Sequence, residues 1–204
     1  LDGDNDLDIL IGNKIEQGDP QSGKVYRLIN EGTPGSPRFQ MSGEFDVGSG
    51  YHLLPAFADL DGDGDLDAVL GTWEDELRFY ENRANDGSIQ LTLVDSAITT
   101  LTRGRNATPT LGDLDSDGDA DMIVGESSGT LNFYENTGTS SQPEFTLISD
   151  EYLGLDVGRR SVPVLHDFDG DGDLDLIVGS ESEGIRLLLN EGTRSIPEFT
   201  DLGP

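Results

Sequence analysis

The fold is decided by a nine-residue acidic block, and its clearest copy reads Asp59-Leu-Asp-Gly-Asp-Gly-Asp-Leu-Asp67. Two further complete copies occupy residues 113–121 and 167–175, and a fourth, at residues 1–8, lacks the first position of the block. The aspartates at the third position are 59, 54 and 54 residues apart: Asp2, Asp61, Asp115 and Asp169. A period of this length indicates a repeat protein in which each copy is one supersecondary unit.

Each block is followed by short runs of β-branched and aromatic residues that end in Gly, Pro or Asn. After the third block, one run closes at Gly125 and a second closes at Asn136. A third run follows, and a fourth, which is opened by Pro163, leads into the next block. Short runs bounded in this way are typical of strands, and no stretch shows a sustained helical period.

We therefore predict an all-β protein, a β-propeller built from four-stranded antiparallel blades, of which this chain holds about 3.75. A β-sandwich is the alternative, but sandwiches do not repeat at a fixed period. The chain is expected to be a single propeller or propeller segment, with blades at approximately 1–48, 49–102, 103–156 and 157–204. The first copy begins after its innermost strand, so three arrangements stay open: a fragment of a longer protein, a ring completed by other chains, and an open arc.

Composition limits the function classes. The 204 residues include 41 acidic and 12 basic side chains, for a formal net charge of −29. A nucleic-acid partner would be repelled by this charge, and no apolar run approaches the roughly 18 residues that a membrane span needs. Cysteine is absent, which removes disulfides, thiolate metal sites and cysteine nucleophiles. The excess of acid instead predicts that a bound cation neutralises part of the chain.

The acidic block has the residue types of a cation-binding loop. Carboxylates at its positions 1, 3, 5 and 9 are expected on one face, and Gly at position 6 (Asn5 in the first copy) permits a sharp chain reversal. Two carboxylates ~5 Å apart repel by roughly 3 kcal/mol at an effective dielectric near 20, so four together require a cation. Flexible all-oxygen loops suit Ca²⁺ better than Mg²⁺. An EF-hand is excluded, because the Glu that it needs at position 12 is replaced by Leu70, Val124 and Val178.

The block, its flanking strands and the glycine that follows resemble the FG-GAP/VCBS repeat of integrin α-subunit-like β-propellers, over nearly the whole chain. The resemblance implies Ca²⁺ loops between the innermost and second strands of each blade, on the face opposite the usual ligand-binding face. The implied ligands of three complete sites are the side chains of Asp59, Asp61, Asp63 and Asp67 with the Asp65 carbonyl; Asp113, Asp115, Asp117 and Asp121 with the Asp119 carbonyl; and Asp167, Asp169, Asp171 and Asp175 with the Asp173 carbonyl. A fourth site keeps Asp2, Asp4, Asp6 and Asp8 but lacks its first ligand.

The face opposite the acidic loops carries the candidate ligand-binding residues. They lie in the loops that open each innermost strand or follow each second strand: Tyr51, His52, Trp73, Arg103, Arg105, Arg159 and Arg160. The arginines could bind a uronate, a sulfate or a carboxylate, and Tyr51 with Trp73 could stack on a sugar. Simpler alternatives are blade packing for Trp73 and, favoured for the arginines, local pairing with Glu126, Glu181 and Glu183.

Three function classes follow, in order of preference. The first is a non-enzymatic, Ca²⁺-dependent module for extracellular recognition or adhesion, with a glycan or protein ligand. The second is a structural subunit that assembles through other chains. The third is a propeller-type polysaccharide lyase, for which Tyr51 and His52 form the one adjacent pair of acid–base residue types. We expect an extracellular or cell-surface location, with no nucleic-acid partner and no membrane span.

Overall fold

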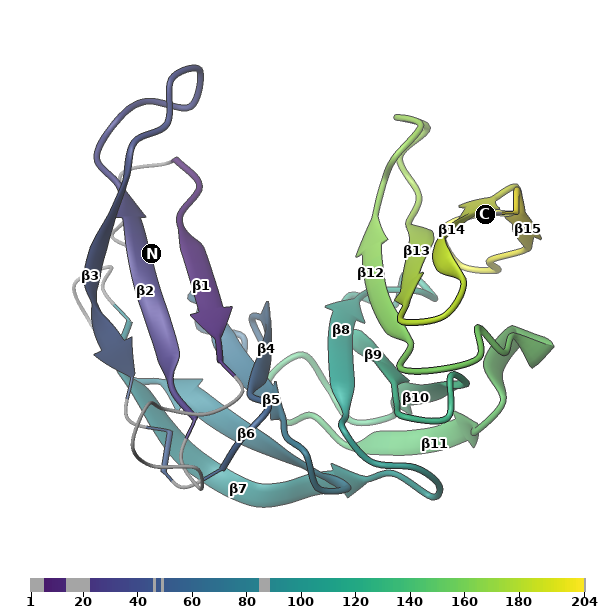
Figure 1. The fold of residues 1–204 in the computed structure, drawn as a ribbon, viewed down its shortest axis with the longest axis horizontal. Helices are drawn as coiled ribbons and strands as arrows, with labels where there is room; N and C mark the ends of the chain where they lie inside the picture. Colours follow the sequence, from purple (N-terminus) through teal and green to yellow (C-terminus); the bar gives the residue numbers. More distant parts are fainter. Residues whose placement is uncertain (1–5, 14–22, 46, 49, 85–88, 204) are drawn as a thin grey trace.

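The structure is a computed structural model that describes residues 6–13, 23–45, 47–48, 50–84 and 89–203 (Figure 1). This part of the chain is almost entirely β-structure, and its one helical segment is the short 3₁₀ turn η1 (Tyr152–Gly154). The strands form four antiparallel sheets that succeed one another as the blades of a β-propeller. The predicted all-β propeller is therefore confirmed.

Each blade corresponds to one copy of the repeat. The first contains β1 (Ile9–Gly12), β2 (Val25–Asn30) and β3 (Phe39–Phe45). The second contains β4 (Leu54–Ala58), β5 (Asp67–Gly71), β6 (Glu76–Asn82) and β7 (Leu91–Thr100). The third contains β8 (Thr108–Gly112), β9 (Asp121–Gly125), β10 (Leu131–Asn136) and β11 (Phe145–Ser149), and the fourth β12 (Val162–His166), β13 (Asp175–Ser180), β14 (Gly184–Asn190) and β15 (Phe199–Asp201).

Neighbouring strands of a blade are consecutive in the chain and pair antiparallel. Each of the three complete acidic blocks therefore lies between an innermost strand and the second strand, as between β8 and β9, whose pairing ends at Gly112 opposite Asp121. In the first blade, β1 occupies the place of the second strand, and the described residues include no innermost strand beside it. All acidic loops thus lie at one end of the blades, and the loops around Tyr51 and Trp73 lie at the other end.

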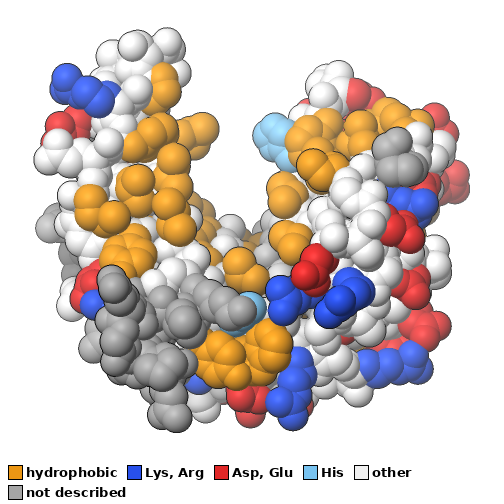
Figure 2. Space-filling model, in the orientation of Figure 1, with side chains coloured by type: hydrophobic (Ala, Val, Ile, Leu, Met, Phe, Trp, Pro, Cys, Tyr) orange, Lys and Arg blue, Asp and Glu red, His pale blue; other side chains and the backbone are white. Residues whose placement is uncertain are grey.

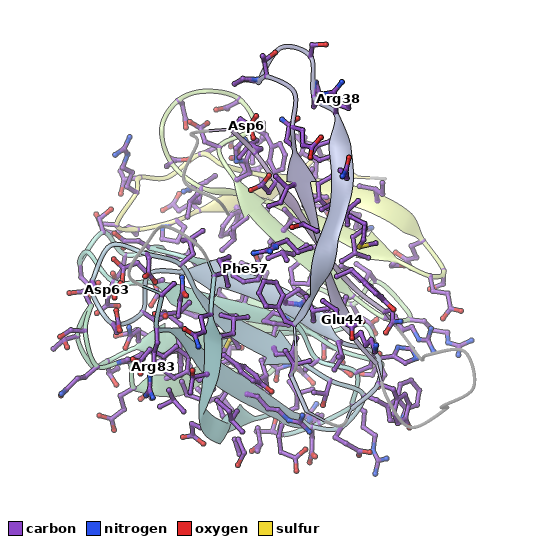
Figure 3. The ribbon with its side chains drawn as sticks, turned by 90° about the vertical axis from the view of Figure 1, so that its left-hand side faces the viewer. Asp6, Arg38, Glu44, Phe57, Asp63 and Arg83 are labelled. Atoms are coloured by element: carbon purple, nitrogen blue, oxygen red, sulfur yellow. The ribbon has the colours of Figure 1, made fainter. Side chains whose placement is uncertain are left out.

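The hydrophobic core lies between successive blades. Because side chains alternate along a strand, one face of a second strand packs on the preceding blade and its other face on the following blade. Between the first and second blades, Val25 packs with Ala68 and Leu70, and Phe57 of β4 packs against them (Figure 3). Between the second and third blades, Val69 and Leu77 pack with Met122 and Val124. Between the third and fourth blades, Ile123 and Leu131 pack with Leu176 and Val178.

Among the described residues, no helix has the length and apolar character to cross a bilayer.

A buried asparagine ends the strand that leads into each outermost hairpin, in β2, β6, β10 and β14. In the third blade, Oδ1 of Asn136 accepts hydrogen bonds from the backbone N–H groups of Gly138 at 3.1 Å and Glu144 at 2.9 Å. The same two bonds recur at Asn30, Asn82 and Asn190. One side-chain oxygen therefore holds both ends of the hairpin that starts the outermost strand.

Replacing this asparagine should destabilise the blade. Asn136→Ala leaves the backbone N–H groups of Gly138 and Glu144, which lie in a partly buried site, without their acceptor. A typical hydrogen bond contributes about 0.5–1.5 kcal/mol to stability. We expect a lower melting temperature in differential scanning calorimetry. Ser140→Ala, at an exposed position in the same hairpin, is the control and should melt like the parent chain. Equal melting of the two variants would contradict the role assigned to Asn136.

Candidate functional site

Three acidic loops each bring three carboxylates together. In every case the residues hold positions 1, 3 and 9 of the block, and one oxygen from each lies within 4.8 Å of the other two. The three groups are Asp59, Asp61 and Asp67; Asp113, Asp115 and Asp121; and Asp167, Asp169 and Asp175. Among the described residues, none of these nine side chains forms an ion pair with an arginine or lysine.

The loop backbone curls around the first aspartate of the block. In the second blade, the two oxygens of Asp59 accept hydrogen bonds from the N–H groups of Gly62 at 2.7 Å and Gly64 at 3.0 Å. Both glycines adopt left-handed φ values, +77° and +93°. The third loop keeps this backbone, with Ser116 at φ +63° and Gly118 at φ +96°. The left-handed conformation predicted for position 6 is therefore present in these loops.

The aspartate at position 9 of the block connects the loop to the sheet. Asp121 is 1% exposed, and its carboxylate accepts hydrogen bonds from the N–H groups of Leu114 at 3.0 Å and Asn136 at 2.9 Å. Asp67 and Asp175 make the equivalent pairs of bonds in their own blades. Burial raises the pKa of Asp67 and of Asp121 to about 6, although these backbone hydrogen bonds act in the opposite direction.

The aspartate at position 7 of the block carries a buried oxygen that needs a partner. Oδ1 of Asp65, of Asp119 and of Asp173 is buried and accepts no hydrogen bond from the described residues. Burial, together with the neighbouring carboxylates, raises the pKa of all three, and that of Asp119 to about 6. A buried anionic oxygen without a donor is costly, and hard divalent cations prefer oxygen ligands. The donor set of each loop therefore fits a cation such as Ca²⁺.

Three parts of the predicted ligand set are not tested by these groups, and the first is the backbone carbonyl at position 7, from Asp65, Asp119 and Asp173. The position-5 aspartates Asp63, Asp117 and Asp171 accept hydrogen bonds from the N–H groups of position 7 at 3.0–3.1 Å, and their role as ligands stays a prediction. In the first loop, Asp2 and Asp4 lie outside the described residues. Asp8 makes the hydrogen bond expected at position 9, from the N–H group of Asn30 at 2.7 Å, and Asp6 lies in the same loop.

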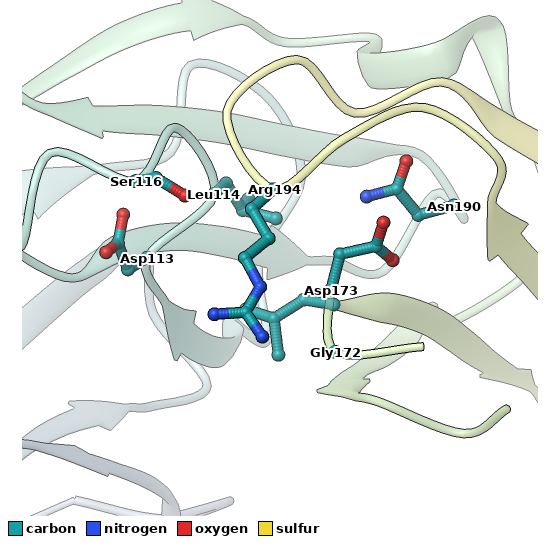
Figure 4. A pocket seen from close by; sticks show the side chains of 8 residues that line it. Asp113, Leu114, Ser116, Gly172, Asp173, Asn190 and Arg194 are labelled. Carbon is teal, nitrogen blue, oxygen red and sulfur yellow. The ribbon is translucent and has the colours of Figure 1, made fainter. Parts of the chain in front are cut away.

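Basic side chains lie beside the acidic loops without entering the triads. Arg83 binds Glu81 at 2.9 Å, on the same side of the molecule as Asp63 (Figure 3). A cavity of about 250 Å³ separates the third and fourth loops, and Arg194 extends into it between Asp113 and Asp173 (Figure 4). These arginine side chains therefore offset only part of the negative charge at this end of the blades.

The opposite end of the blades is connected by backbone hydrogen bonds that run from loop to loop. Trp73 N–H donates to the carbonyl of Tyr51, and the carbonyl of Trp73 accepts from Asn106 N–H, both at 3.0 Å. Further bonds link Ser127 to Arg105, Arg160 to Ser127, and Glu181 to Arg159. Residues 52, 106 and 160, which are equivalent in the repeat, all have left-handed φ values between +54° and +61°. Such strain in non-glycine residues persists only where the surroundings hold it, and it is frequent at binding sites.

The aromatic candidates form one half-buried cluster on this face. Tyr51 stacks on Trp73, with ring centroids 5.6 Å apart and an interplanar angle of 23°. The ring of His52 lies 4.7 Å from that of Trp73, and the guanidinium of Arg160 lies 5.9 Å from the same ring. Four of the seven predicted ligand-binding residues are therefore in contact, on loops from the second and fourth blades.

The four candidate arginines all form local ion pairs in the described part of the chain, and two of them pair with an acidic residue that was expected from the sequence. Arg159 and Arg160 both approach Glu181, at 4.0 and 3.7 Å. Arg105 approaches Glu74 at 3.6 Å, and Arg103 pairs with Asp150 at 3.4 Å and with Glu151. The partners of Arg103 and Arg105 were not foreseen, because they come from loop ends that only the folded blades bring close.

Glu126 has a different role from the predicted arginine pairing. It is fully buried, and its carboxylate accepts hydrogen bonds from the backbone and hydroxyl groups of Ser128 and Thr130, in its own loop. Glu183, the other expected partner, approaches Arg186 at 3.8 Å. Of the three predicted acidic partners, Glu181 alone pairs with one of the candidate arginines in the described part of the chain.

Comparison with known proteins identifies the repeat. A family model described as FG-GAP-like repeat matches residues 1–70, 59–124 and 113–178. The three matches together span most of the chain. Each match ends inside a second strand, directly before the glycine that follows the acidic block and its apolar run. No curated protein matches the sequence significantly.

The loop conformation leads to a test that needs no ligand. Gly118 has φ +96° and free space where a Cβ would lie, so Gly118→Ala introduces backbone strain without a clash. Holding a side-chain-bearing residue in such a conformation costs of order 1–3 kcal/mol, and we expect a lower midpoint in urea unfolding. Gly35→Ala is the matched control, because Gly35 also has free space but no left-handed φ. If Gly118→Ala were as stable as Gly35→Ala, the assigned loop conformation would be wrong.

Proposed function

This chain belongs to the FG-GAP-like repeat family, and from that premise we propose that it is a Ca²⁺-binding β-propeller module for extracellular recognition or adhesion. In this proposal, Ca²⁺ is structural and occupies the acidic loops. The ligand, a glycan or a protein, binds at the opposite end of the blades. Adhesion and recognition need no reacting group, and the proposal assigns no catalytic residue.

The observation that carries the proposal is the threefold recurrence of one carboxylate group. A single acidic turn is common on protein surfaces, but three loops repeat the same triad, with their oxygens within 4.8 Å. Each also contains a buried carboxylate oxygen that no described residue satisfies. Chelation by these groups would offset repulsion in a chain of net charge −29 and would close the loops in a protein that has no disulfides.

Calcium should bind to the loops and stabilise the fold. A ligand that binds only the folded state at a hundredfold excess over its Kd adds about 2.7 kcal/mol per site. We expect Ca²⁺ to raise the melting temperature more than Mg²⁺ does, because the smaller ion requires strict octahedral geometry. Asp115→Asn should lower the Ca²⁺ stoichiometry by one equivalent in isothermal titration calorimetry.

Asp75→Asn is the matched control for this experiment. Asp75 is an exposed aspartate in the loop at the other end of the second blade, so its variant should keep the parental stoichiometry. An unchanged melting temperature after exhaustive chelation, or a stoichiometry that does not respond to Asp115→Asn, would refute the calcium sites.

The proposed ligand surface is the cluster of Tyr51, His52, Trp73 and Arg160. Its rings lie 4.7–5.8 Å apart, and its backbone is held by hydrogen bonds to neighbouring loops. Stacked aromatic rings offer an apolar platform for the face of a sugar, and an adjacent guanidinium favours an anionic group. A surface held in place in the free protein loses little entropy on binding.

Binding to an array of neutral, uronate-containing and sulfated glycans tests this surface. We expect binding in Ca²⁺ that is lost in chelator and in Trp73→Ala, since the ring supplies the stacking area. Leu93→Ala, an exposed apolar residue on β7, should bind like the parent. Binding that survives Trp73→Ala would exclude the cluster as the ligand site, and release of unsaturated sugar products would favour the lyase alternative.

A further inference from the structure

The third acidic loop differs from the second and fourth loops in the residue at position 4 of the block. That residue is a glycine in the second and fourth loops, where Gly62 and Gly170 have φ values of +77° and +84°. The third loop carries Ser116 at this position, and Ser116 adopts the same left-handed conformation, with φ +63°. Glycine adopts this conformation freely, whereas a residue with a Cβ is disfavoured in it. The third loop is therefore the more strained of the three.

The first aspartate of the third block is also held by fewer hydrogen bonds than its counterparts. Asp59 and Asp167 each accept one bond of 2.7 Å from the N–H group of position 4 and one of 3.0 Å from that of position 6. Within the described part of the chain, Asp113 accepts the second of these bonds only, from Gly118, and its length is 3.3 Å. A group that is less fixed in the free protein loses more entropy when it binds. The third loop is thus the least prepared for a cation.

An unpaired arginine lies beside the third loop. On the face drawn in Figure 2, the basic side chains of the third and fourth blades lie close to acidic ones. Arg194 forms no ion pair with any described residue, and it extends into the cavity between the third and fourth loops, between Asp113 and Asp173 (Figure 4). Arg83, on the second blade, is instead paired with Glu81 at 2.9 Å. A guanidinium without an anionic partner repels a second cation nearby.

The fourth loop borders the same cavity but keeps the features that the third loop lacks. Its position 4 is Gly170, and Asp167 accepts both hydrogen bonds. It also places Asp173, which is 8% exposed, at the cavity, and Oδ1 of Asp173 accepts no hydrogen bond from the described residues. A buried anionic oxygen of this kind favours a cation. Because Arg194 lies near both loops, the fourth loop is a reference for the effect of Ser116.

We infer that the third loop binds Ca²⁺ more weakly than the second and fourth loops and is the last of the three to fill. This inference rests on the proposed binding of Ca²⁺ to the loops. The expected difference in Kd is about tenfold, or about 1.4 kcal/mol, which is within the cost of one residue in the left-handed conformation. At Ca²⁺ concentrations between the two Kd values, the third loop responds to a change in Ca²⁺ while the second and fourth loops stay filled.

Calorimetric titration of the Ca²⁺-free chain with Ca²⁺ tests this order of filling. The parent chain should show tighter steps and a step that is about tenfold weaker. Asp115→Asn should remove the weaker step, because Asp115 belongs to the third triad. Asp61→Asn and Asp169→Asn, at the same position of the second and fourth blocks, should each remove a tighter step.

Exchanging the residues at position 4 tests the physical cause. Ser116→Gly should tighten the weaker step about tenfold. Gly170→Ser should weaken the fourth loop by a similar factor, since Gly170 has φ +84° and free space where a Cβ would lie. Arg194→Gln should tighten the weaker step about twofold, because it removes a repelling charge. Arg38→Gln makes the same charge change on the outer hairpin of the first blade (Figure 3) and should leave that step unchanged.

Circular dichroism of each variant is the check of folding. Equal affinity at the three loops, removal of a tighter step by Asp115→Asn, or parental Kd values in both Ser116→Gly and Gly170→Ser would overturn this inference and leave the calcium sites in place. Absence of any Ca²⁺ uptake by the parent chain would instead refute the proposed function, and this inference with it.

Discussion

A buried aspartate at the start of the second strand is the contact on which each blade depends. Asp67, Asp121 and Asp175 are at most 1% exposed, and each accepts one N–H from its own acidic loop and one from the asparagine that begins the outer hairpin. A charge is buried at considerable cost unless hydrogen bonds or a cation compensate it. The same carboxylate belongs to the triad that could hold a metal ion, so loop closure, strand pairing and the candidate metal site involve one side chain.

This arrangement separates two kinds of chemistry along the strands. One end of the blades concentrates carboxylates in flexible, glycine-containing turns, which is the donor set of a hard cation. The other end contains loops that are joined across blades by backbone hydrogen bonds and hold three non-glycine residues in left-handed conformations. Strands only five to ten residues long separate these ends in the complete blades, apart from the three-residue β15. An anionic ligand bound near Trp73 would therefore be kept apart from the acidic loops by the body of the blade.

Much of the architecture could be predicted because each repeat specifies its strands and turns through residues that are close together in the sequence. The block, the glycine after each strand and the fixed period predicted the strands, their antiparallel order and the loops between them. The hydrogen-bonding role of Asn136 and its equivalents was missed, although their recurrence at the end of one strand in every copy was a usable signal. The ion pairs of Arg103 and the buried setting of Glu126 had no such signal, since their partners or enclosure depend on how loops meet.

The sequence by itself determined the repeat, the blade topology and the residues able to bind a cation, because turn chemistry and alternation act over a few residues. Tertiary structure alone decided that three of the predicted carboxylates meet within 4.8 Å in each loop, and that Tyr51, His52 and Trp73 gather beside Arg160. It also decided which apolar strand positions are buried and which are exposed. Those outcomes depend on contacts between blades: Ile185 pairs with Gly179 as Leu131 pairs with Gly125, yet Leu131 is buried by the following blade and Ile185 is 67% exposed.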